Sequence, residues 1–133
     1  MSAAPPRYEG FAPGRHAIDA YGAGGFRFAG MSHVGSILAT PRGIAALDAT
    51  DLGDITDATL APLFEEMAGA PGGIEFIVVG TGERMALLPP LLSRLLRTAG
   101  LRIESMATGS AARVYNVMLG ENRRVAALLL AAP

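Results

Sequence analysis

The sequence predicts one α/β domain, and three features lead to this fold class. The chain has 133 residues, which is the usual size of a single domain with one hydrophobic core. Half of its residues are apolar and only 17% are charged, as in well-packed globular proteins. After several short strand-like runs, segments with strand and helix periodicity alternate to the end of the chain, which is typical of α/β folds.

We expect the folded domain to span residues 17–133, after a flexible N-terminal arm formed by residues 1–16. The arm contains three of the nine prolines and shows no periodicity. From "AIDAYGAGGFRFAG" to "GSILATPRGIAAL", short apolar runs are separated by Gly and Pro. This pattern predicts three or four strands joined by hairpin turns.

A first helix is predicted over residues 56–69. Its apolar side chains recur at helical spacing, with Thr59 as the expected N-cap and Gly69 at the C-terminal end. The next segment, "IEFIVVG", contains a nearly continuous apolar run and predicts a central strand covered on both faces. "PPLLSRLLRTAG" then predicts a second helix, which begins near Pro90 and stops at Gly100.

The C-terminal third continues the alternation of strand and helix. "LRIESMA" alternates as a strand does, residues 110–119 predict a short helix that ends at Gly120, and residues 125–130 predict the last strand. Strands linked through helices by short connections form parallel pairs with right-handed crossovers. The sequence therefore predicts a mainly parallel sheet.

Composition excludes several classes of function. The formal net charge is −1, and eleven Arg residues are scattered among twelve acidic residues, so no nucleic-acid-binding surface is expected. The chain has no Cys, which excludes disulfides and thiolate sites. Its longest apolar stretch, "VAALLLAAP", is shorter than the roughly 20 residues that span a membrane as a helix. The opening "MSAAPPRYEGFAP" resembles neither a signal peptide nor an import segment, so we expect a cytoplasmic protein.

No complete catalytic or metal-binding motif is present. His16 and His33 have no second ligand at metal-site spacing, and Ser32 lies in "GMSHVG", which does not fit a nucleophile elbow. In "GAGGFRF", Arg27 stands where a dinucleotide fingerprint needs Gly. Four acids recur in a loop where turn and cap hydrogen bonds favour Asp: Asp48, Asp51, Asp54 and Asp57. We expect no catalytic residues, no metal and no cofactor.

Two Thr-Gly turns carry the remaining functional interest. "GTGERM" follows the predicted central strand and "ATGSAARVYN" follows the next strand, and ligands of open α/β sheets commonly bind at the carboxyl ends of strands. Backbone N–H groups, hydroxyls and a guanidinium there could hold an anion at a helix N-terminus. The candidate ligand-binding residues are Gly80, Thr81, Gly82, Thr108, Gly109, Arg113 and Asn116.

A purely structural interpretation of these residues is equally open. Gly82 and Gly109 could serve only to permit tight turns, and Thr108 or Ser110 could serve only to cap a helix. Asn116 could serve only to tie down a neighbouring loop. Both interpretations predict a helix that starts close to the second turn.

Four separated segments together resemble a known family. They are "YGAGGFRFAG", "GSILATP", "IVVGTGERMALLPP" and "MATGSAARVYNVMLGENRRVAALL", and they resemble the family of the mitochondrial complex I (NADH:ubiquinone oxidoreductase) assembly factor 3 in order and spacing. The similarity covers about residues 18–130. It implies a three-layer α/β domain with a central mixed, mostly parallel sheet of about five strands, one of them antiparallel, and a small N-terminal β layer.

For function, the resemblance implies a non-enzymatic interaction protein that helps to assemble respiratory complex I, with assembly proteins or subunits of that complex as partners. His33 stands where the family usually has an aromatic residue, and Ala107 and Ala112 stand where members carry Asp and often Cys. A catalytic role built on that acid or thiol is excluded here. The alternative is a small-molecule (anion) binding protein, or an enzyme of unknown reaction, that uses the cleft between residues 80–82 and 108–116. The sequence indicates no oligomeric state.

Overall fold

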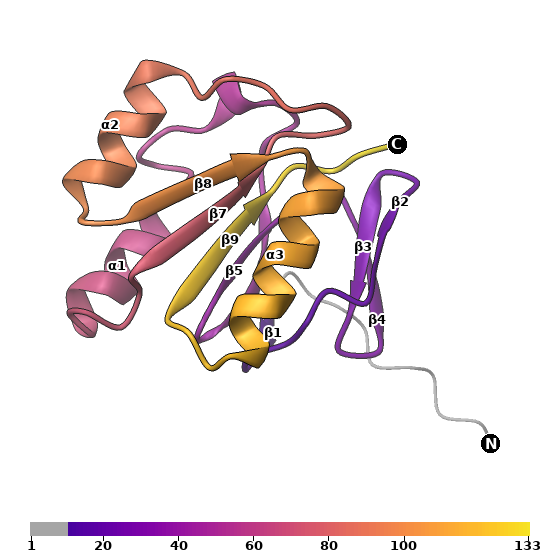
Figure 1. The fold of residues 1–133 in the computed structure, drawn as a ribbon, viewed down its shortest axis with the longest axis horizontal. Helices are drawn as coiled ribbons and strands as arrows, with labels where there is room; N and C mark the ends of the chain where they lie inside the picture. The colour runs from indigo at the N-terminus through magenta and orange to yellow at the C-terminus, as the bar shows by residue number, and fades with distance from the viewer. Residues whose placement is uncertain (1–10) are drawn as a thin grey trace.

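The computed structural model describes residues 11–133, which form two β-sheets and three α-helices (Figure 1). The main sheet has six strands in the order β1-β6-β5-β9-β7-β8. Its strands are β1 (Phe11–Pro13), β5 (Ser36–Thr40), β6 (Gly43–Leu47), β7 (Phe76–Gly80), β8 (Arg102–Met106) and β9 (Val125–Leu129).

The main sheet has an antiparallel half and a parallel half. Strands β5 and β6 form a hairpin, and β1 pairs with the outer side of β6 in antiparallel register. Strand β7 lies parallel to both β8 and β9. Strand β9 pairs with β5 in antiparallel register, so the last strand of the chain joins the two halves.

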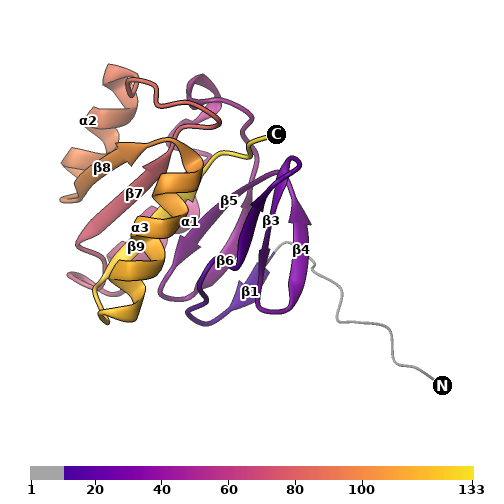
Figure 2. The ribbon, with the colours of Figure 1, turned by 45° about the vertical axis from the view of Figure 1, so that its right-hand side comes forward.

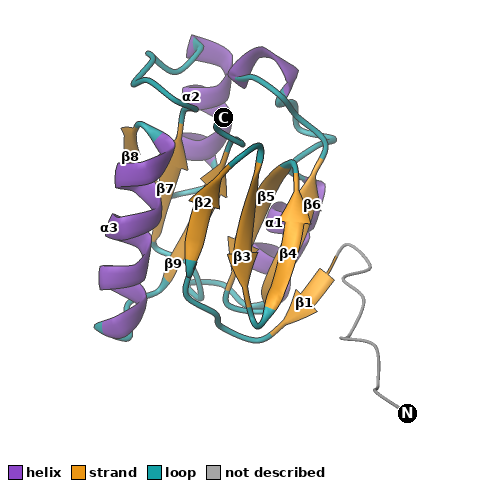
Figure 3. Ribbon diagram, turned by 90° about the vertical axis from the view of Figure 1, so that its right-hand side faces the viewer, coloured by secondary structure: helices purple, strands orange, loops and turns teal. Residues whose placement is uncertain are grey.

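A small antiparallel sheet forms a separate layer. It consists of β2 (Ala20–Gly22), β3 (Gly25–Phe28) and β4 (Met31–Val34), with β3 in the middle. Figure 3 shows this sheet beside helix α3 (Thr108–Gly120), with both lying over the same face of the main sheet. The N-terminal strands thus cover the part of that face which α3 leaves open.

Helices α1 (Ala61–Gly69) and α2 (Pro90–Thr98) cover the opposite face of the main sheet (Figure 2). The chain steps outward from β7 to β8 through α2, then returns across β7 to β9 through α3. Right-handed crossovers in opposite directions place their helices on opposite faces. The result is a three-layer arrangement with a hydrophobic core on each side of the sheet.

Strand β9 shows how the two cores are built. Ala126 and Leu128 face the core under α1 and α2, whereas Val125, Ala127 and Leu129 face the core under α3 and the small sheet. All five residues are buried, which explains the continuous apolar run in the sequence. Burying one of the Val or Leu side chains among them stabilises the fold by roughly 1.5–3 kcal/mol.

The predicted α/β class, the mixed sheet and the small N-terminal β layer are confirmed. The main sheet nevertheless has six strands rather than about five, and three of its five neighbouring pairs are antiparallel, which a mostly parallel sheet would not have. The difference arises in the N-terminal half, where the hairpin of β5 and β6 joins the main sheet instead of the small layer.

The predicted N-terminal arm needs a correction in its last residues. Residues 1–10 lie outside the part of the chain that the structure describes, but Phe11–Pro13 form strand β1. Pro13 is paired with Gly43 at the end of this edge strand. A proline has no N–H to donate and is therefore tolerated on an edge strand, so its presence was a poor indicator of an arm here.

Two predicted helix caps are also corrected. Helix α1 begins at Ala61 after Leu60, and Thr59 instead forms hydrogen bonds with Thr56 in the preceding turn. Helix α3 begins at Thr108, two residues before the predicted start, and its N-cap is Ala107, without a side-chain cap. The Thr108 hydroxyl does not cap the helix because it is bound elsewhere.

The acidic loop before α1 does contain local caps, as predicted for its Asp residues. Asp51 accepts a hydrogen bond from the N–H of Gly53 at 2.7 Å, and Asp54 accepts from the N–H groups of Thr50 and Asp51 at 3.0 and 3.1 Å. These bonds stabilise the short 3-10 helix η1 (Leu52–Asp54). Within residues 11–133, no group of three or more His, Asp or Glu side chains could hold a metal ion, and no helix has the length and apolar character to cross a membrane.

Candidate functional site

The carboxyl ends of β7 and β8 bring the two predicted Thr-Gly turns together. The N–H of Thr81 donates to the carbonyl of Met106 at 2.9 Å, and the N–H of Thr108 donates to the carbonyl of Gly82 at 2.8 Å. In return, the N–H of Gly82 donates to the Thr108 hydroxyl at 2.9 Å. The turns therefore face each other and are connected directly by hydrogen bonds.

Thr108 is the central polar residue of this junction. Its side chain is fully buried, and its hydroxyl also donates to the carbonyl of Leu130 at 2.7 Å. One hydroxyl thus connects the turn after β7, the start of α3 and the end of β9. A buried hydroxyl that has both a donor and an acceptor partner stabilises the fold.

The remaining polar groups of the two turns are similarly engaged. The Thr81 hydroxyl lies 2.7 Å from the carbonyl of Arg84 and accepts a hydrogen bond from the N–H of Ala86 at 3.1 Å. Gly82 has φ +106°, a left-handed conformation that favours glycine. Gly80 ends β7, and its carbonyl accepts from the N–H of Leu130 at 3.0 Å.

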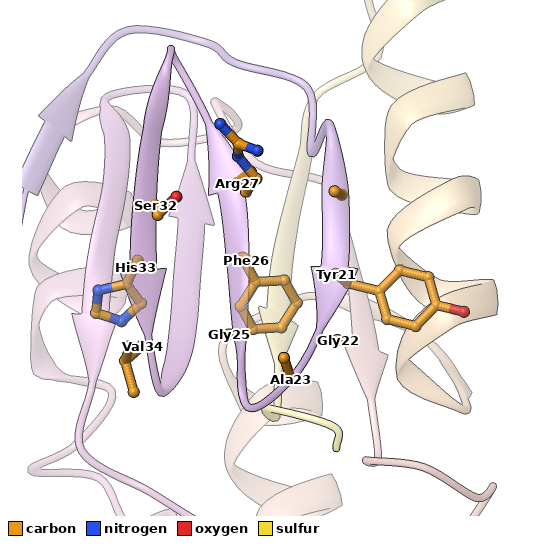
Figure 4. A pocket seen from close by; sticks show the side chains of 10 residues that line it. Tyr21, Gly22, Ala23, Gly25, Phe26, Arg27, Ser32, His33 and Val34 are labelled. Atoms are coloured by element: carbon orange, nitrogen blue, oxygen red, sulfur yellow. The ribbon is translucent and has the colours of Figure 1, made fainter.

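Gly109 permits a close contact between α3 and the small sheet. A Cβ atom at this position would collide with the ring and hydroxyl of Tyr21 on β2. Figure 4 shows the Tyr21 side chain extending from β2 towards the helix. The glycine therefore makes room for a tyrosine over the first turn of α3, which sequence reasoning missed because the partner lies 88 positions away in the chain.

The last two candidate residues lie further along α3. Asn116 forms two hydrogen bonds with the backbone of Ile18, one to its N–H and one to its carbonyl, both 2.8 Å long. This arrangement matches the structural interpretation, in which Asn116 holds a neighbouring segment. Arg113 is exposed, and within residues 11–133 it forms no hydrogen bond or ion pair. A ligand-binding role for these turns stays a prediction.

An open groove between α1 and α2 offers a different kind of site. It has a volume of about 680 Å³. Its α2 wall presents Leu91, Arg94, Leu95 and Thr98, which follow the i, i+3, i+4, i+7 spacing of a single helix face. Its other wall is formed by Phe64, Met67 and Ala68 of α1 and by Pro71 and Gly72, which follow this helix.

The groove is mainly apolar but carries one cation, Arg94, and one carboxylate, Asp57. Leu91 is 63% exposed, although leucine side chains of this kind are usually buried, and Arg94 is exposed one turn further along α2. Among the described residues, the ion pairs Arg123–Glu121 and Arg124–Glu75 are formed, and neither involves Arg94. An apolar surface with an unpaired cation is suited to binding another macromolecule.

Sequence reasoning did not find this groove. The sequence predicts helix α2, and Leu92 and Leu96 are buried against the sheet, but nothing in the sequence of this helix predicts a groove beside it. Leu91 and Arg94 lie on the adjoining face. Whether that face borders a groove depends on where α1 sits on the sheet, and no local periodicity encodes this distance.

A second hollow lies on the small sheet, with a volume of about 440 Å³ (Figure 4). Its lining includes Tyr21, Phe26, Arg27, His33 and Val34. The His33 ring nitrogen Nε2 lies 3.2 Å from the carbonyl of Ser36, and the ring packs near Phe28 with centroids 6.4 Å apart. Through these contacts the His33 side chain attaches β4 to neighbouring segments, which gives this histidine a structural role.

Comparison with known proteins identifies the family. Residues 18–130 match the family described as "Protein of unknown function (DUF498/DUF598)". The chain belongs to this family. A relative from Rhodobacter capsulatus, described as an uncharacterized protein, is 41% identical over 96% of this chain and 94% of its own length.

Two further relatives bear on fold and function. A crystal structure described as an outer membrane protein from Bartonella henselae is 45% identical, with a TM-score of 0.81 over 91% of this chain and 98% of that chain. The NADH dehydrogenase [ubiquinone] 1 alpha subcomplex assembly factor 3 of Xenopus tropicalis is 31% identical over 85% of this chain. This DUF498/DUF598 chain spans 60% of the length of that assembly factor. The resemblance to the assembly factor 3 family is thereby confirmed.

Proposed function

We propose that this protein is a non-enzymatic assembly helper of the cytoplasm that binds partner proteins transiently, with assembly proteins or subunits of respiratory complex I as its partners. The observation that carries this proposal is the open, apolar groove between α1 and α2. A transient interface needs to bury only about 1,200 Å² or less in total, so a two-helix surface is of a suitable size.

The relationship to the complex I assembly factors supports the identity of the target. The similar region is the α/β domain itself, which the assembly factor shares over 113 aligned residues. The polar chemistry of the two Thr-Gly turns is consistent with a binding protein rather than an enzyme, because the hydroxyls of Thr81 and Thr108 are occupied by backbone groups. We therefore assign no catalytic residue.

Gene deletion and complementation test this function in the host cell. We expect deletion to lower the amount of assembled complex I and its NADH:ubiquinone activity, and the unmodified gene to restore both. Leu91→Glu should fail to restore them although it folds, because Leu91 is exposed in the groove and contributes little to the core. Normal complex I in the deletion strain would contradict the proposal.

Anion binding at the two Thr-Gly turns is the alternative function. Its support is the exposed Arg113 guanidinium near the start of α3, where a helix N-terminus favours anions. Inorganic phosphate at a hundred times its dissociation constant would stabilise the fold by about 2.7 kcal/mol. Arg113→Ala should remove this stabilisation in a thermal unfolding assay, and an unmodified protein that does not respond to phosphate would rule out this anion.

A further inference from the structure

We infer that the groove between α1 and α2 binds an amphipathic helix of the partner protein, and that an acidic side chain beside the apolar stripe of this helix pairs with Arg94. This inference rests on the proposed function and deepens it, because it states the chemistry of the partner segment.

The shape of the groove favours a helix as its occupant. Both walls are helical, and each presents side chains that lie three and four positions apart, so the groove floor is flanked by two rows of ridges. On α2 this row runs from Leu91 to Thr98, which corresponds to a length of about 10 Å at 1.5 Å per residue. An amphipathic helix docks into such a groove with anchors at i, i+3, i+4 and i+7.

The side chains of the groove select an apolar anchor face. Phe64, Met67 and Leu95 are only partly buried within the chain, so each retains surface that a partner could cover. Methionine is unbranched and adapts to the shape of an incoming side chain. Large aliphatic or aromatic anchors on the partner would therefore fill the space between the two helices.

The charge on the α2 wall of the groove favours an acidic side chain beside the apolar stripe of the partner helix. Helix α2 carries Arg94 and Arg97 and has no acidic residue of its own. Asp57 also lines the groove, but within residues 11–133 it forms no ion pair with Arg94, and its carboxylate accepts the N–H of Ala58 at 2.9 Å. Complementary charge would come from a carboxylate of the partner on the side that faces α2.

A second copy of this chain fits the groove less well. In a symmetric dimer whose twofold axis passes through the groove, the two hollows would face each other and leave unfilled space between them. A convex helix fills the hollow without such a void, and voids forfeit packing contacts. We therefore assign the groove to a partner helix.

Binding of designed helical peptides to the full-length protein tests the inference. The acidic peptide carries Leu at i, i+3, i+4 and i+7 with Glu on both flanks of this stripe, and the basic peptide carries Lys at the same flanking positions. We expect the acidic peptide to bind about fivefold or more tightly than the basic one in low salt, as measured by fluorescence anisotropy. Arg94→Glu should reverse this preference.

Arg97→Glu is the matched control, because Arg97 lies on the same helix and is exposed but does not line the groove. It should leave the preference for the acidic peptide in place, and circular dichroism would verify that both variants fold. Equal binding of both peptides, or equal effects of the two Arg variants, would overturn the inference. An acidic peptide without the Leu stripe should not bind. If it does bind, the inference that apolar anchors of the partner fill the groove is overturned.

Two further outcomes separate this inference from the proposed function. If sedimentation shows a dimer that Leu91→Glu disrupts, a second copy occupies the groove and the partner-helix inference fails. If no peptide binds while gene deletion still lowers complex I activity, the proposed function stands and only the inference about the groove fails.

Discussion

At the scale of single residues, the Thr108 hydroxyl makes the most consequential hydrogen bonds of the junction. Thr108→Val keeps the shape of the side chain but leaves the N–H of Gly82 and the carbonyl of Leu130 without this partner. Because buried unpaired groups cost about 1–3 kcal/mol each, we expect the free energy of unfolding to fall by about 2–4 kcal/mol in urea denaturation. Ser110→Ala, at an exposed position of the same helix, should change it by less than about 0.5 kcal/mol. Equal effects of the two variants would contradict this role of Thr108.

The effect of Gly109→Ala on the free energy of unfolding should change sign when the Tyr21 side chain is removed. In the unmodified protein, Gly109→Ala should destabilise the fold by no more than about 1 kcal/mol, since the new methyl group meets the end of the half-exposed Tyr21 side chain, which has to turn aside. In a Tyr21→Ala background the collision is gone, and alanine should stabilise α3 by up to about 1 kcal/mol because it is the better helix former. Urea denaturation of the four proteins measures this coupling. The same loss in both backgrounds would show that the contact does not matter.

The phenol of Tyr115 links stability to alkaline pH. Burial raises the pKa of Tyr115 to about 12, and the nearby positive charge of Arg15 opposes the shift without cancelling it. The unfolded chain ionises near pH 10 and the folded chain only near pH 12, so the free energy of unfolding should fall between these values, by up to about 3 kcal/mol. Below pH 10 the contribution is fully present. Tyr115→Phe should flatten this part of the pH profile in urea denaturation, and an unchanged profile would contradict this link.

At the scale of elements, Asn116 fastens the small sheet to α3. Its side chain satisfies both backbone groups of Ile18, which lies two residues before the start of β2. Asn116→Ala should therefore increase native-state hydrogen exchange at the amide of Ile18 and through the small sheet, while amides of β7 and β9 keep their protection. Val117→Ala, at the exposed neighbouring position, is the control. Unchanged exchange at Ile18 would mean that other contacts hold this segment.

The elements differ in how far local sequence determines them. Helix α2 was predicted because Pro90 suits the first turn, Gly100 suits the exit and the apolar side chains recur with the helical period. Strand β1 was missed because its partner residues, such as Ala45 opposite Phe11, are distant in the chain. Such a pairing depends on how the sheet is assembled, and a three-residue strand is too short to show a recognisable alternation of apolar and polar residues.

At the scale of the whole molecule, the candidate sites also divide into those that the sequence predicts and those that depend on how distant segments pack together. The meeting of the two Thr-Gly turns was predictable, because the carboxyl ends of neighbouring parallel strands lie at one edge of a sheet. The groove was not, since it depends on the separation of α1 and α2 across the sheet. The contact between Tyr21 and Gly109 also required the small sheet to be placed over α3, and no motif in either segment indicates this.

The position of β9 has a consequence for how the protein is made. Strand β9 follows all the other described helices and strands in sequence, yet it lies between β5 and β7 and contacts both hydrophobic cores. Until residues 125–129 have left the ribosome, the hairpin of β5 and β6 and the pair of β7 and β8 have no strand between them. Each half would expose an unpaired edge and half-built cores during synthesis, so the fold closes only in a late, cooperative step.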